Sequence, residues 1–471
     1  MAIVGEHAVV IGAGIGGLLA ARVLGEHFTG VTVLERDTLP ADPVARKCVP
    51  QGRHAHALLA RGAAAFDRLF PGFTAQLIEQ GAPTGDVGTG ARWMLGGHRF
   101  APSATGIRAI GASRPLIEWQ LRERVRSLPN VVIAEHRTAI GFTGDRGRVA
   151  GVITRYAGSD LGEMVDADLV VDASGRSSQT QPWLEEFGGA RPQEERMTIR
   201  LAYATRHFRR EPADDGRIAL AVGATQELPR GGLVLAQEGD AWVVTLAGYG
   251  RDEPPIEPDG FAAFAATLPD PEFGRFVADT EPLDEPTRYR IPTTVRRHYH
   301  RVALPAGYLP FGDAICCFNP IYGQGMSVAG TEALALLGCL GAGTADLAPR
   351  FLHDIRSTVA NAWNAAADSD LQMSCVEGTR SPRTRLVNAH TARVHRAASA
   401  DPVVATRFLR VSNLVDPPTA LLRPSTVCRV IRGNLRRTAP PDSKWFTTTR
   451  SGGESRVVHI RPSATSGSMG G

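Results

Sequence analysis

The sequence predicts an α/β fold that combines a parallel, nucleotide-binding sheet with a mostly antiparallel sheet and a helical C-terminal region. Three observations predict it. A short apolar strand, a glycine-rich turn and an apolar helix follow one another within residues 7–24. A second glycine-rich turn at residues 323–325 also opens an apolar helix. Residues 190–300, between the two turns, alternate apolar and polar side chains, which is the period of strands with one buried face.

The first glycine-rich turn has the spacing of a dinucleotide-binding site. Gly12, Gly14 and Gly17 complete G-x-G-x-x-G between the strand "AVVI" and a helix that begins near Ile15. These glycines allow the tight turn, the approach of a pyrophosphate and close helix–strand packing, in that order. Glu35 ends the next strand, about 20 residues onward, where a carboxylate accepts ribose hydroxyls. This Rossmann-like unit predicts NAD or FAD, and the alternative is a tight turn without a ligand.

The second glycine-rich stretch distinguishes between NAD and FAD. "YLPFGDA" predicts a strand that ends at Gly312 and Asp313, and "GQG" then opens a helix. A carboxylate at a strand end can accept hydrogen bonds from a polyol, and a helix N-terminus suits the negative charge of a flavin ring. NAD does not need this element, whereas FAD has a ribityl chain and a ring to hold. The sequence therefore predicts FAD, with a capped loop-to-helix joint as the alternative.

The chain resembles the flavoprotein monooxygenases of the para-hydroxybenzoate hydroxylase type, whose FAD site combines these two motifs. Within that superfamily the closer likeness is to the flavin epoxidases of polyether-ionophore biosynthesis, those for lasalocid and monensin. The stretches that carry it, in the same order and register, are "VPQGRHAHALLARG", "ADLVVDASGRSS", "YATRHFRR" and "GDAICCFNPIYGQGMS". The likeness extends from about residue 7 to about residue 430.

The resemblance implies a Rossmann-like FAD-binding domain of the glutathione-reductase type with an inserted, mostly antiparallel substrate domain that roofs the flavin. We expect the FAD-binding domain at 1–85, 111–190 and 301–345, and the substrate domain at 86–110 and 191–300. A helical region follows at 346–439, and the polar composition of 440–471 predicts a disordered tail. The expected FAD-contacting residues are Gly12, Gly14, Ile15, Gly16, Gly17, Glu35, Arg36, Arg53, Arg114, Asp172, Gly312, Asp313, Pro320, Gly323, Gln324, Gly325 and Met326.

Arg114 and Asp172 are expected in this set for different reasons. Arg114 stands just before a predicted helix, between Ser113 near the N-cap and Pro115 near the first turn. A cation there is favourable only beside an anion, and by resemblance it reaches the FAD phosphates or ribityl chain. Asp172 ends the strand of "ADLVVDASGRSS". In many relatives an Asp-Gly pair here helps to hold FAD and a nicotinamide cofactor, and this chain interrupts that pair with Ala173 and Ser174. Electrons then come from NADPH directly or from a partner flavin reductase.

The resemblance implies a monooxygenase that uses FAD and O2. Reduced flavin would form a C4a-hydroperoxide that delivers one oxygen atom to an apolar small molecule, with the hard chemistry supplied by the cofactor. Epoxidation of a polyketide or isoprenoid alkene in secondary metabolism is expected. Hydroxylation of a phenol needs a general base, and no single residue of the sequence is indicated as that base, whereas an alkene needs none. Hydroxylation of an aromatic or polyketide substrate and an isoprenoid reductase or dehydrogenase are the alternatives.

Two further alternatives have less support in the residues. A flavin halogenase would carry a paired-tryptophan motif and a lysine near the substrate, and "GDAWVVTLAG" has one tryptophan. A non-catalytic FAD-binding partner would have a degraded site, and no motif of this chain is degraded in that way.

The stretch "CVPQGRHAHALLARG" holds two histidines whose spacing disfavours a metal. His54 and His56 stand two apart, so they point to opposite faces of an extended segment, and no C-x-x-C or H-x-x-x-H partner stands nearby. By resemblance this segment passes the flavin, with the backbone of Gly52 and Arg53 close to the ring. His56 and Tyr322 are the candidates for a catalytic role, and packing of one histidine in the core is the alternative.

Composition excludes several function classes. A net charge of +4 is small for 471 residues and predicts no nucleic-acid partner, and the arginines near the C-terminus are typical of solvated helix faces. No run of about 20 apolar residues predicts a membrane span, and the first residues lack the pattern of a signal peptide. The six cysteines have no regular spacing, which favours free thiols in a cytoplasmic protein.

Overall fold

A five-stranded, wholly parallel sheet forms one end of the protein in the computed structural model, which describes residues 2–435. Its strand order is β17-β11-β1-β2-β7. The bounds are β1 Gly5–Ile11, β2 Phe28–Leu34, β7 Val131–Ala134, β11 Leu169–Asp172 and β17 Tyr308–Pro310. Its central strands are short apolar runs buried on both faces, as a parallel sheet covered by helices requires. The carboxyl ends of all five strands lie at one edge, so residues after β1, β2, β11 and β17 gather there.

Three helices pack around one another beside this sheet. They are α1 (Ile15–Leu24), α4 (Arg114–Arg126) and α8 (Gly325–Leu340), and α1 contacts both of the others. The predicted cap of α4 is confirmed: the Ser113 hydroxyl accepts a hydrogen bond from the Leu116 amide at 3.1 Å. Pro115 lies in the first turn, where its missing N–H costs nothing.

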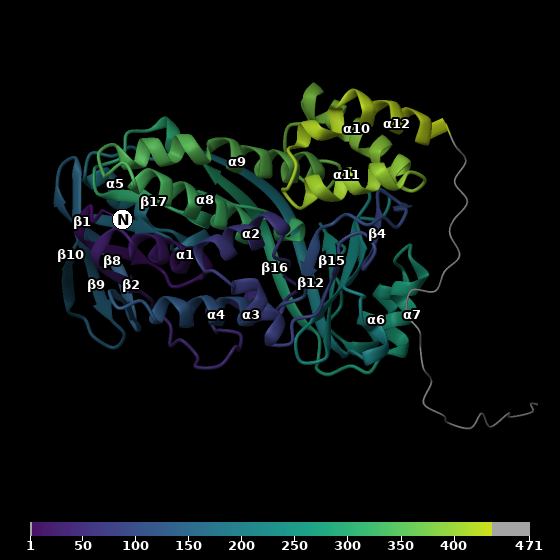
Figure 1. Cartoon of the computed structure of the whole chain (residues 1–471), viewed down its shortest axis with the longest axis horizontal. Helices are drawn as coiled ribbons and strands as arrows, with labels where there is room; N and C mark the ends of the chain where they lie inside the picture. The colour runs from purple at the N-terminus through teal and green to yellow at the C-terminus, as the bar shows by residue number, and fades with distance from the viewer. Residues whose placement is uncertain (1, 436–471) are drawn as a thin grey trace, which may run out of the picture.

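A larger, eight-stranded sheet stands beside the parallel sheet, and the two long strands β12 and β16 run from one to the other (Figure 1). Its order is β18-β16-β12-β15-β14-β13-β4-β5, antiparallel except between β13 and β4. The bounds are β4 Ala91–Leu95, β5 His98–Arg99, β12 Glu194–Arg209, β13 Ala219–Val222, β14 Arg230–Gln237, β15 Ala241–Tyr249, β16 Thr287–Arg297 and β18 Cys316–Cys317. The predicted combination of a parallel and a mostly antiparallel sheet is confirmed.

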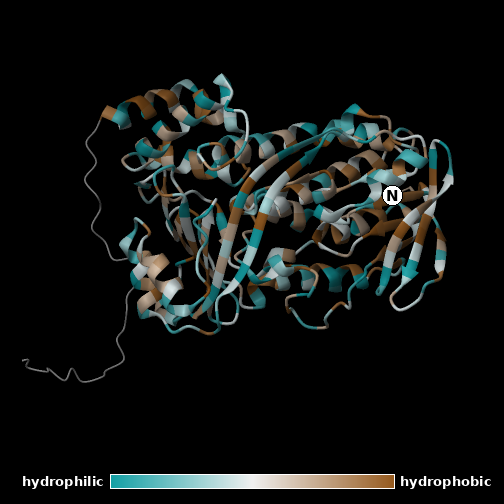
Figure 2. Ribbon diagram, turned by 180° about the vertical axis from the view of Figure 1, so that it is seen from behind, coloured by the Kyte–Doolittle hydropathy of each residue, from teal (hydrophilic) through white to brown (hydrophobic). Residues whose placement is uncertain are grey.

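The two faces of the large sheet contact different parts of the protein. Figure 2 shows hydropathy alternating along its long strands. One face carries Ala204 and Phe208 and packs on α6 (Pro258–Ala266) and α7 (Pro271–Asp279). Residues of the other face, among them Tyr203 and Tyr249, join the core of the parallel-sheet layer. That inner face is the expected roof of the candidate site.

The remaining elements connect and cover these layers. A three-stranded antiparallel sheet, which the sequence did not predict, and a two-stranded ribbon use β8 Arg137–Asp145, β9 Arg148–Tyr156, β10 Gly162–Asp166, β3 Thr84–Asp86 and β6 Arg108–Ile110. The other helices are α2 Ala60–Leu69, α3 Phe73–Glu79, α5 Thr180–Glu186, α9 Leu347–Asp370, α10 Pro382–Ala398, α11 Pro402–Ser412 and α12 Pro424–Leu435. The 3₁₀ turns are η1 Pro50–Arg53, η2 Gly175–Ser177, η3 Pro212–Asp214, η4 Tyr299–Arg301, η5 Gly312–Ala314, η6 Pro320–Tyr322 and η7 Pro418–Leu422.

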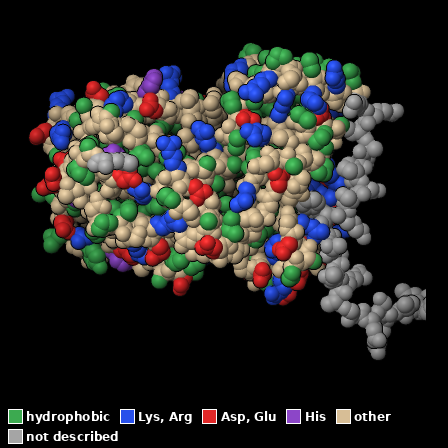
Figure 3. Space-filling view, in the orientation of Figure 1, with side chains coloured by type: hydrophobic (Ala, Val, Ile, Leu, Met, Phe, Trp, Pro, Cys, Tyr) green, Lys and Arg blue, Asp and Glu red, His purple; other side chains and the backbone are tan. Residues whose placement is uncertain are grey.

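The C-terminal helices form a separate small layer. In Figure 3, blue side chains gather over α10 and α12; these are arginines, and several of them are exposed. Within residues 2–435, no helix combines the length and the hydrophobicity that a membrane span needs. The predicted disordered tail, 440–471, and the last four residues of the predicted helical region lie outside the described residues.

A buried carboxyl group joins η5 to α8. Glu332 lies in the middle of α8 with no exposed surface, and its Oε2 accepts a hydrogen bond from the Gly312 amide at 2.7 Å. Within the described residues its Oε1 has no partner. Burial raises the pKa of Glu332 to about 8, against the opposing effect of the Gly312 amide. Glu332 is therefore protonated at neutral pH in the folded chain.

We expect Glu332→Gln to remove a pH-dependent stability loss. The folded pKa of about 8 exceeds the ordinary value of 4.5. The contribution of Glu332 is therefore full below pH 4.5 and is lost as the pH rises toward 8, at about 1.4 kcal/mol per pH unit. Chemical denaturation of the cofactor-free protein between pH 4.5 and 8.5 should show that the free energy of unfolding of the variant increases relative to that of the wild type as the pH rises. A constant difference between the two proteins across this pH range would contradict the prediction. Glu332→Leu, which loses the acceptor for the Gly312 amide, should be less stable than Glu332→Gln at every pH.

Candidate functional site

The turn between β1 and α1 leaves an open cradle of backbone N–H groups. Gly12 has φ +101°, which favours glycine. A Cβ on Gly17 would lie 1.8 Å from the Gly12 carbonyl oxygen, so no other residue fits there without a shift. A Cβ on Gly14 would meet nothing within 4 Å, and no side chain caps α1. Free N–H groups, a helix N-terminus and empty space together fit a pyrophosphate.

Glu35 lies beside this cradle and is held by three donors. It follows β2 directly and is 7% exposed. Its Oε2 accepts hydrogen bonds from the Ala13 amide at 3.1 Å and from Arg46 at 2.9 Å. Its Oε1 accepts from the Asp37 amide at 3.0 Å. The carboxylate is thereby fixed next to the glycine turn, whereas the neighbouring predicted residue Arg36 is exposed.

Arg46 is a site residue that the sequence did not indicate. It is buried, and its Nη1 and Nε lie 2.9 and 2.7 Å from the carboxylates of Glu35 and Glu118. Glu118 also pairs with Arg114 at 3.5 Å. Burial alone would lower the pKa of Arg46, but Glu118 and Glu35 outweigh it and raise that pKa. Four alternating charges thus run from the cradle to the start of α4, where the predicted residue Arg114 lies.

Asp172, at the end of β11, is wholly buried, and its carboxylate is used inside the protein. Its Oδ1 accepts from the amide and hydroxyl of Ser174 at 3.0 and 2.5 Å. Its Oδ2 accepts from Ser178, Thr180 and Tyr308 at 2.6, 2.8 and 3.3 Å. These bonds fix the loop that carries η2, including Arg176. Asp172 therefore shapes the loop that follows it.

The opposite end of the site surrounds Asp313. Its side chain keeps exposed surface, yet burial raises its pKa, against the lowering effects of Arg176 and Arg114. Asp313 is exposed, and a Cβ on the preceding Gly312 would meet nothing within 4 Å, so open space lies in front of these residues, which we call the Asp313 hollow. A Cβ on Gly325 would lie 3.9 Å from the Asp313 Oδ1, so the N-terminus of α8 faces the same hollow. Gln324, which precedes α8, has a buried side-chain oxygen without a partner among residues 2–435.

Two histidines lie between this hollow and the large sheet. The Nδ1 of His54 lies 2.7 Å from the Thr205 hydroxyl, and its ring stacks on Tyr289 with 5.4 Å between centroids. The Nδ1 of His56 lies 2.9 Å from the His54 carbonyl oxygen. Burial is the main cause that lowers their pKa values, to about 4 for His54 and about 3 for His56, with Arg114 adding to the effect on His56. Both rings are therefore neutral at neutral pH.

The other residues of the loop between β2 and α2 and of the late glycine-rich turn lie as follows. Gly52 is buried and Arg53 is exposed in η1. Gly323 has φ +64°, and a Cβ there would lie 3.5 Å from Ala57, so the late glycine-rich turn lies against the loop between β2 and α2. The remaining predicted residues Ile15 and Met326 are buried, Pro320 is exposed, and Gly16 and Gly312 are partly buried. Among residues 2–435 no group of three metal-ligating side chains occurs.

Asp370, at the end of α9, is a second residue that the sequence did not indicate. Its Oδ1 accepts hydrogen bonds from Tyr249 at 3.1 Å, Asn319 at 2.8 Å and Tyr322 at 2.8 Å. Burial raises its pKa to about 6, although the three donors lower it. This Asp370 cluster joins the inner face of the large sheet to η6. It surrounds Tyr322, one of the two predicted catalytic candidates.

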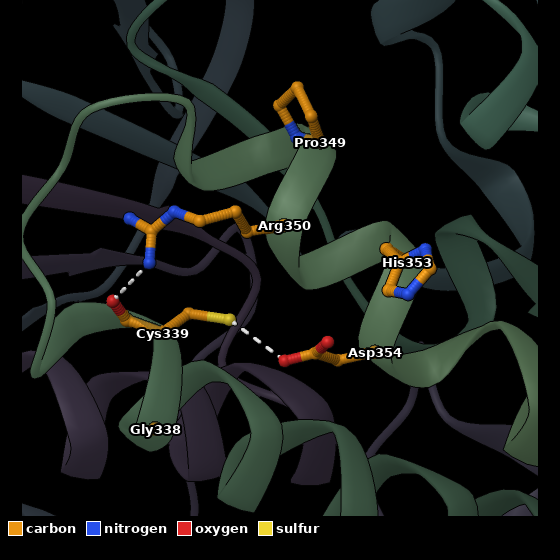
Figure 4. Close-up of a pocket in the computed structure, with 6 residues that line it drawn as sticks. All are labelled: Gly338, Cys339, Pro349, Arg350, His353 and Asp354. Carbon is orange, nitrogen blue, oxygen red and sulfur yellow. Dashed lines mark hydrogen bonds between the residues drawn. The ribbon is translucent and has the colours of Figure 1, made fainter.

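A hollow of about 400 Å³ between α8 and α9 is separate from this site (Figure 4). Arg350 donates to the Cys339 carbonyl oxygen at 2.8 Å, and the Cys339 thiol lies 3.5 Å from Asp354. Burial raises the pKa of Cys339 to about 11, so the thiol is protonated. The polar groups of this hollow contact one another, as expected where two helices pack together.

Gly14→Ala should reduce FAD affinity without destabilising the protein. Its Cβ has room in the folded chain, but it would enter the space that fits the pyrophosphate. We expect the Kd for FAD to rise at least about tenfold, or about 1.4 kcal/mol, and the melting temperature of the cofactor-free protein to stay unchanged. Gly17→Ala, whose Cβ would meet the Gly12 carbonyl oxygen, should raise the Kd for FAD and also lower the melting temperature. Fluorescence titration and thermal unfolding check this, and unchanged FAD affinity in Gly14→Ala would refute it.

Comparison with known proteins gives two relatives in sequence, and no family model matches the chain. Protein Rv3254 of Mycobacterium tuberculosis is 36% identical over 452 residues, which cover 92% of this chain and 94% of that protein. Kynurenine 3-monooxygenase of Salinispora tropica is 27% identical over 434 residues, which cover 86% of this chain and 84% of that enzyme.

Solved structures with similar folds differ in their chemistry. PqsL of Pseudomonas aeruginosa, described as a probable FAD-dependent monooxygenase, has a TM-score of 0.62 at 15% identity, covering 78% of this chain and 96% of PqsL. The flavin-dependent halogenase CmlS gives 0.62 at 16%, with 86% and 76% covered. The Diels-Alderase PyrE3 gives 0.59 at 19%, with 87% and 81% covered. The chain thus has the fold of the FAD-dependent monooxygenases and halogenases, and it belongs to the family of Protein Rv3254.

Proposed function

We propose that the protein is an FAD-dependent monooxygenase that transfers one oxygen atom from O2 to an apolar small molecule. The observation that carries the proposal is the row of charges Glu35, Arg46, Glu118 and Arg114, which links the open cradle at Gly14 to the Asp313 end of the site. A dinucleotide with a pyrophosphate at one end and a flat ring at the other would use both ends of that row. The names of kynurenine 3-monooxygenase and PqsL agree with this reaction class.

FAD would be held by both glycine-rich turns. Gly12, Gly14, Ile15, Gly16 and Gly17 would bind its pyrophosphate, and Glu35, with Arg36 nearby, its adenosine ribose. Arg114 and Asp313 would bind the middle of the molecule. The buried Arg114 Nε and Gln324 Oε1 have no hydrogen-bond partners within the described residues, so both atoms are free to form hydrogen bonds with FAD. The ring would lie against Arg53, Gly312, Pro320, Gly323, Gly325 and Met326, with Asp172 supporting the loop behind. Bound FAD supplies the two-electron chemistry and the reaction with O2.

The chain's own residues would orient the acceptor and exclude water. The inner face of the large sheet presents buried Leu201, Tyr203, Tyr249 and Ile291. Because His54 and His56 are neutral, neither ring adds a charge to that side of the site. Such surroundings favour an apolar acceptor. Epoxidation of a polyketide or isoprenoid alkene is the reaction that we propose first, since it needs no base.

Hydroxylation of an aromatic ring is the second candidate, and the Asp370 cluster favours it. A carboxylate with a pKa of about 6, hydrogen-bonded to Tyr322 and Tyr249, could accept a phenol proton through a tyrosine hydroxyl. The likeness to kynurenine 3-monooxygenase agrees with an aromatic acceptor.

Halogenation has less support. The chain contains two lysines, Lys47 and Lys444. Lys47 is exposed in the loop before η1, and Lys444 lies outside the described residues. The expected halogenase lysine beside the substrate therefore has no candidate within residues 2–435. A reductase or dehydrogenase of the same fold differs from a monooxygenase in using no oxygen atom, which a labelling experiment can measure.

We expect the FAD-loaded protein to incorporate one atom of ¹⁸O2 into product when it is chemically reduced and mixed with oxygen and an acceptor. A panel of apolar alkenes and phenols, analysed by mass spectrometry, tests this, and chemical reduction makes the result independent of the natural electron donor. Product with no ¹⁸O would support the reductase or dehydrogenase. Brominated or chlorinated product in the presence of halide would support the halogenase, and a rearranged product formed without reduction would indicate a non-redox enzyme.

The variant Asp370→Asn tests whether the oxygen acceptor is a phenol or an alkene. With a phenol, kcat/KM should rise with pH through about 6 as Asp370 ionises. In the variant, this rising limb of the pH profile should disappear and kcat/KM should fall about 10²-fold. With an alkene, the wild type should show no such limb. Asp368→Asn is the matched control, because Asp368 is two residues away in α9 and pairs with Arg383. A limb near pH 6 that persists with a phenol in Asp370→Asn would contradict the role of Asp370.

A further inference from the structure

Another hollow, of about 420 Å³, is lined in part by η2, which contacts η5 and so lies at the Asp313 end of the candidate site. Its walls come from the loop that carries η2, from the start of β12 and from β16. Four arginines line it: Arg176, Arg196, Arg290 and Arg297. We call it the arginine pocket. Tyr289, which stacks on His54, is also part of its wall, so the pocket reaches the residues that face the expected flavin ring.

The pocket has an excess of positive charge. Arg196 and Arg297 share one carboxylate, Glu194. Arg290 pairs with Glu253. Arg176 donates to the Thr293 carbonyl oxygen at 2.6 Å and makes no ion pair with any residue in 2–435. Three of the four guanidinium groups thus pair directly with two carboxylates, Glu194 and Glu253. The nearby carboxyl group of Asp313 also interacts with Arg176 and Arg297. An anion that enters the pocket therefore still meets more positive than negative groups.

Two of these ion pairs can exchange partners at little cost. The side chains of Arg196 and Arg290 are 59% and 58% exposed, and exposed pairs contribute little to stability. A phosphate offers the same bidentate geometry to a guanidinium and carries more charge than a carboxylate. Arg297 is different, because it is 6% exposed and also donates to the Ala314 carbonyl oxygen at 2.9 Å. It forms the fixed inner wall, and the two exposed arginines form an adjustable rim.

We propose that the arginine pocket binds the phosphate groups of a soluble co-substrate that has to reach the flavin ring. The inference rests on the proposed function, because the pocket has this use only if a redox ring lies beside Asp313. Two sources carry the required chemistry. One is a reducing nicotinamide dinucleotide, whose phosphates would anchor it next to the flavin. The other is a substrate carried on a phosphate-bearing thiol handle of the coenzyme A kind.

The test is direct binding to the oxidised, FAD-loaded protein, measured by calorimetry with NADP⁺, coenzyme A and inorganic pyrophosphate as separate probes. We expect at least one probe to bind, and its affinity to fall with added salt. In the double variant Arg196→Gln/Arg290→Gln the Kd should rise about ten- to a hundredfold. Arg209→Gln is the matched control, because Arg209 is an exposed, ion-paired arginine at the far end of β12. It should bind like the wild type.

The outcomes distinguish the sources and separate this proposal from the proposed function. Tighter binding of NADP⁺ than of pyrophosphate assigns the pocket to the electron donor, and tighter binding of coenzyme A assigns it to the substrate. Binding of pyrophosphate alone that the double variant weakens still supports a phosphate site. No binding by any probe, or equal binding in the double variant, overturns the proposal. The flavin absorbance of the same samples reports FAD loading, so failure of the FAD site is seen independently.

Discussion

The close approach of Gly17 to the carbonyl oxygen of Gly12 is the contact on which the rest of the site depends. It lets α1 start directly at the end of β1, because a Cβ at Gly17 would lie 1.8 Å from that oxygen. The helix N-terminus consequently lies at the edge of the sheet where the other parallel strands also end. Glu35 and Asp313 follow β2 and β17, on opposite sides of β1 in the sheet, so residues about 280 positions apart in the sequence stand at the same edge as this turn.

Charge organises the site at a second level. Arg46 is buried between Glu35 and Glu118, and Arg114 completes the row. Each buried ion costs desolvation energy, which its neighbours offset only while the whole row stays in place. The row therefore makes the position of Arg114 depend on that of Glu35. An anionic ligand that spans the two would contact both ends of a single rigid network.

The sequence predicted the parts of the fold and the site that depend on local pattern. Two glycine motifs, a capped helix at Ser113 and the alternation along residues 190–300 each specify a local geometry, and the structure has all four. It could not predict that β4 and β5, far earlier in the chain, extend the large sheet, because strand partners are chosen by tertiary packing. Arg46 and Asp370 were missed for the same reason. Arg46 lies in an irregular loop, and Asp370 ends an ordinary amphipathic helix, so neither has a signal until the chain folds around it.

The two sides of the Asp313 hollow differ in a way that restricts what can enter from each. Beneath the large sheet the histidines are neutral, the surface is aromatic and the carboxyl group of Asp370 is shared among three donors. An anion on that side would lose its hydration without gaining a counter-charge from these residues. On the side of η2 and β16, arginines exceed carboxylates, and an anion gains a partner as it loses water. With FAD bound as proposed, an apolar molecule and an anionic one would meet its ring from different sides. Such an arrangement would suit the two chemically unlike co-substrates that we propose.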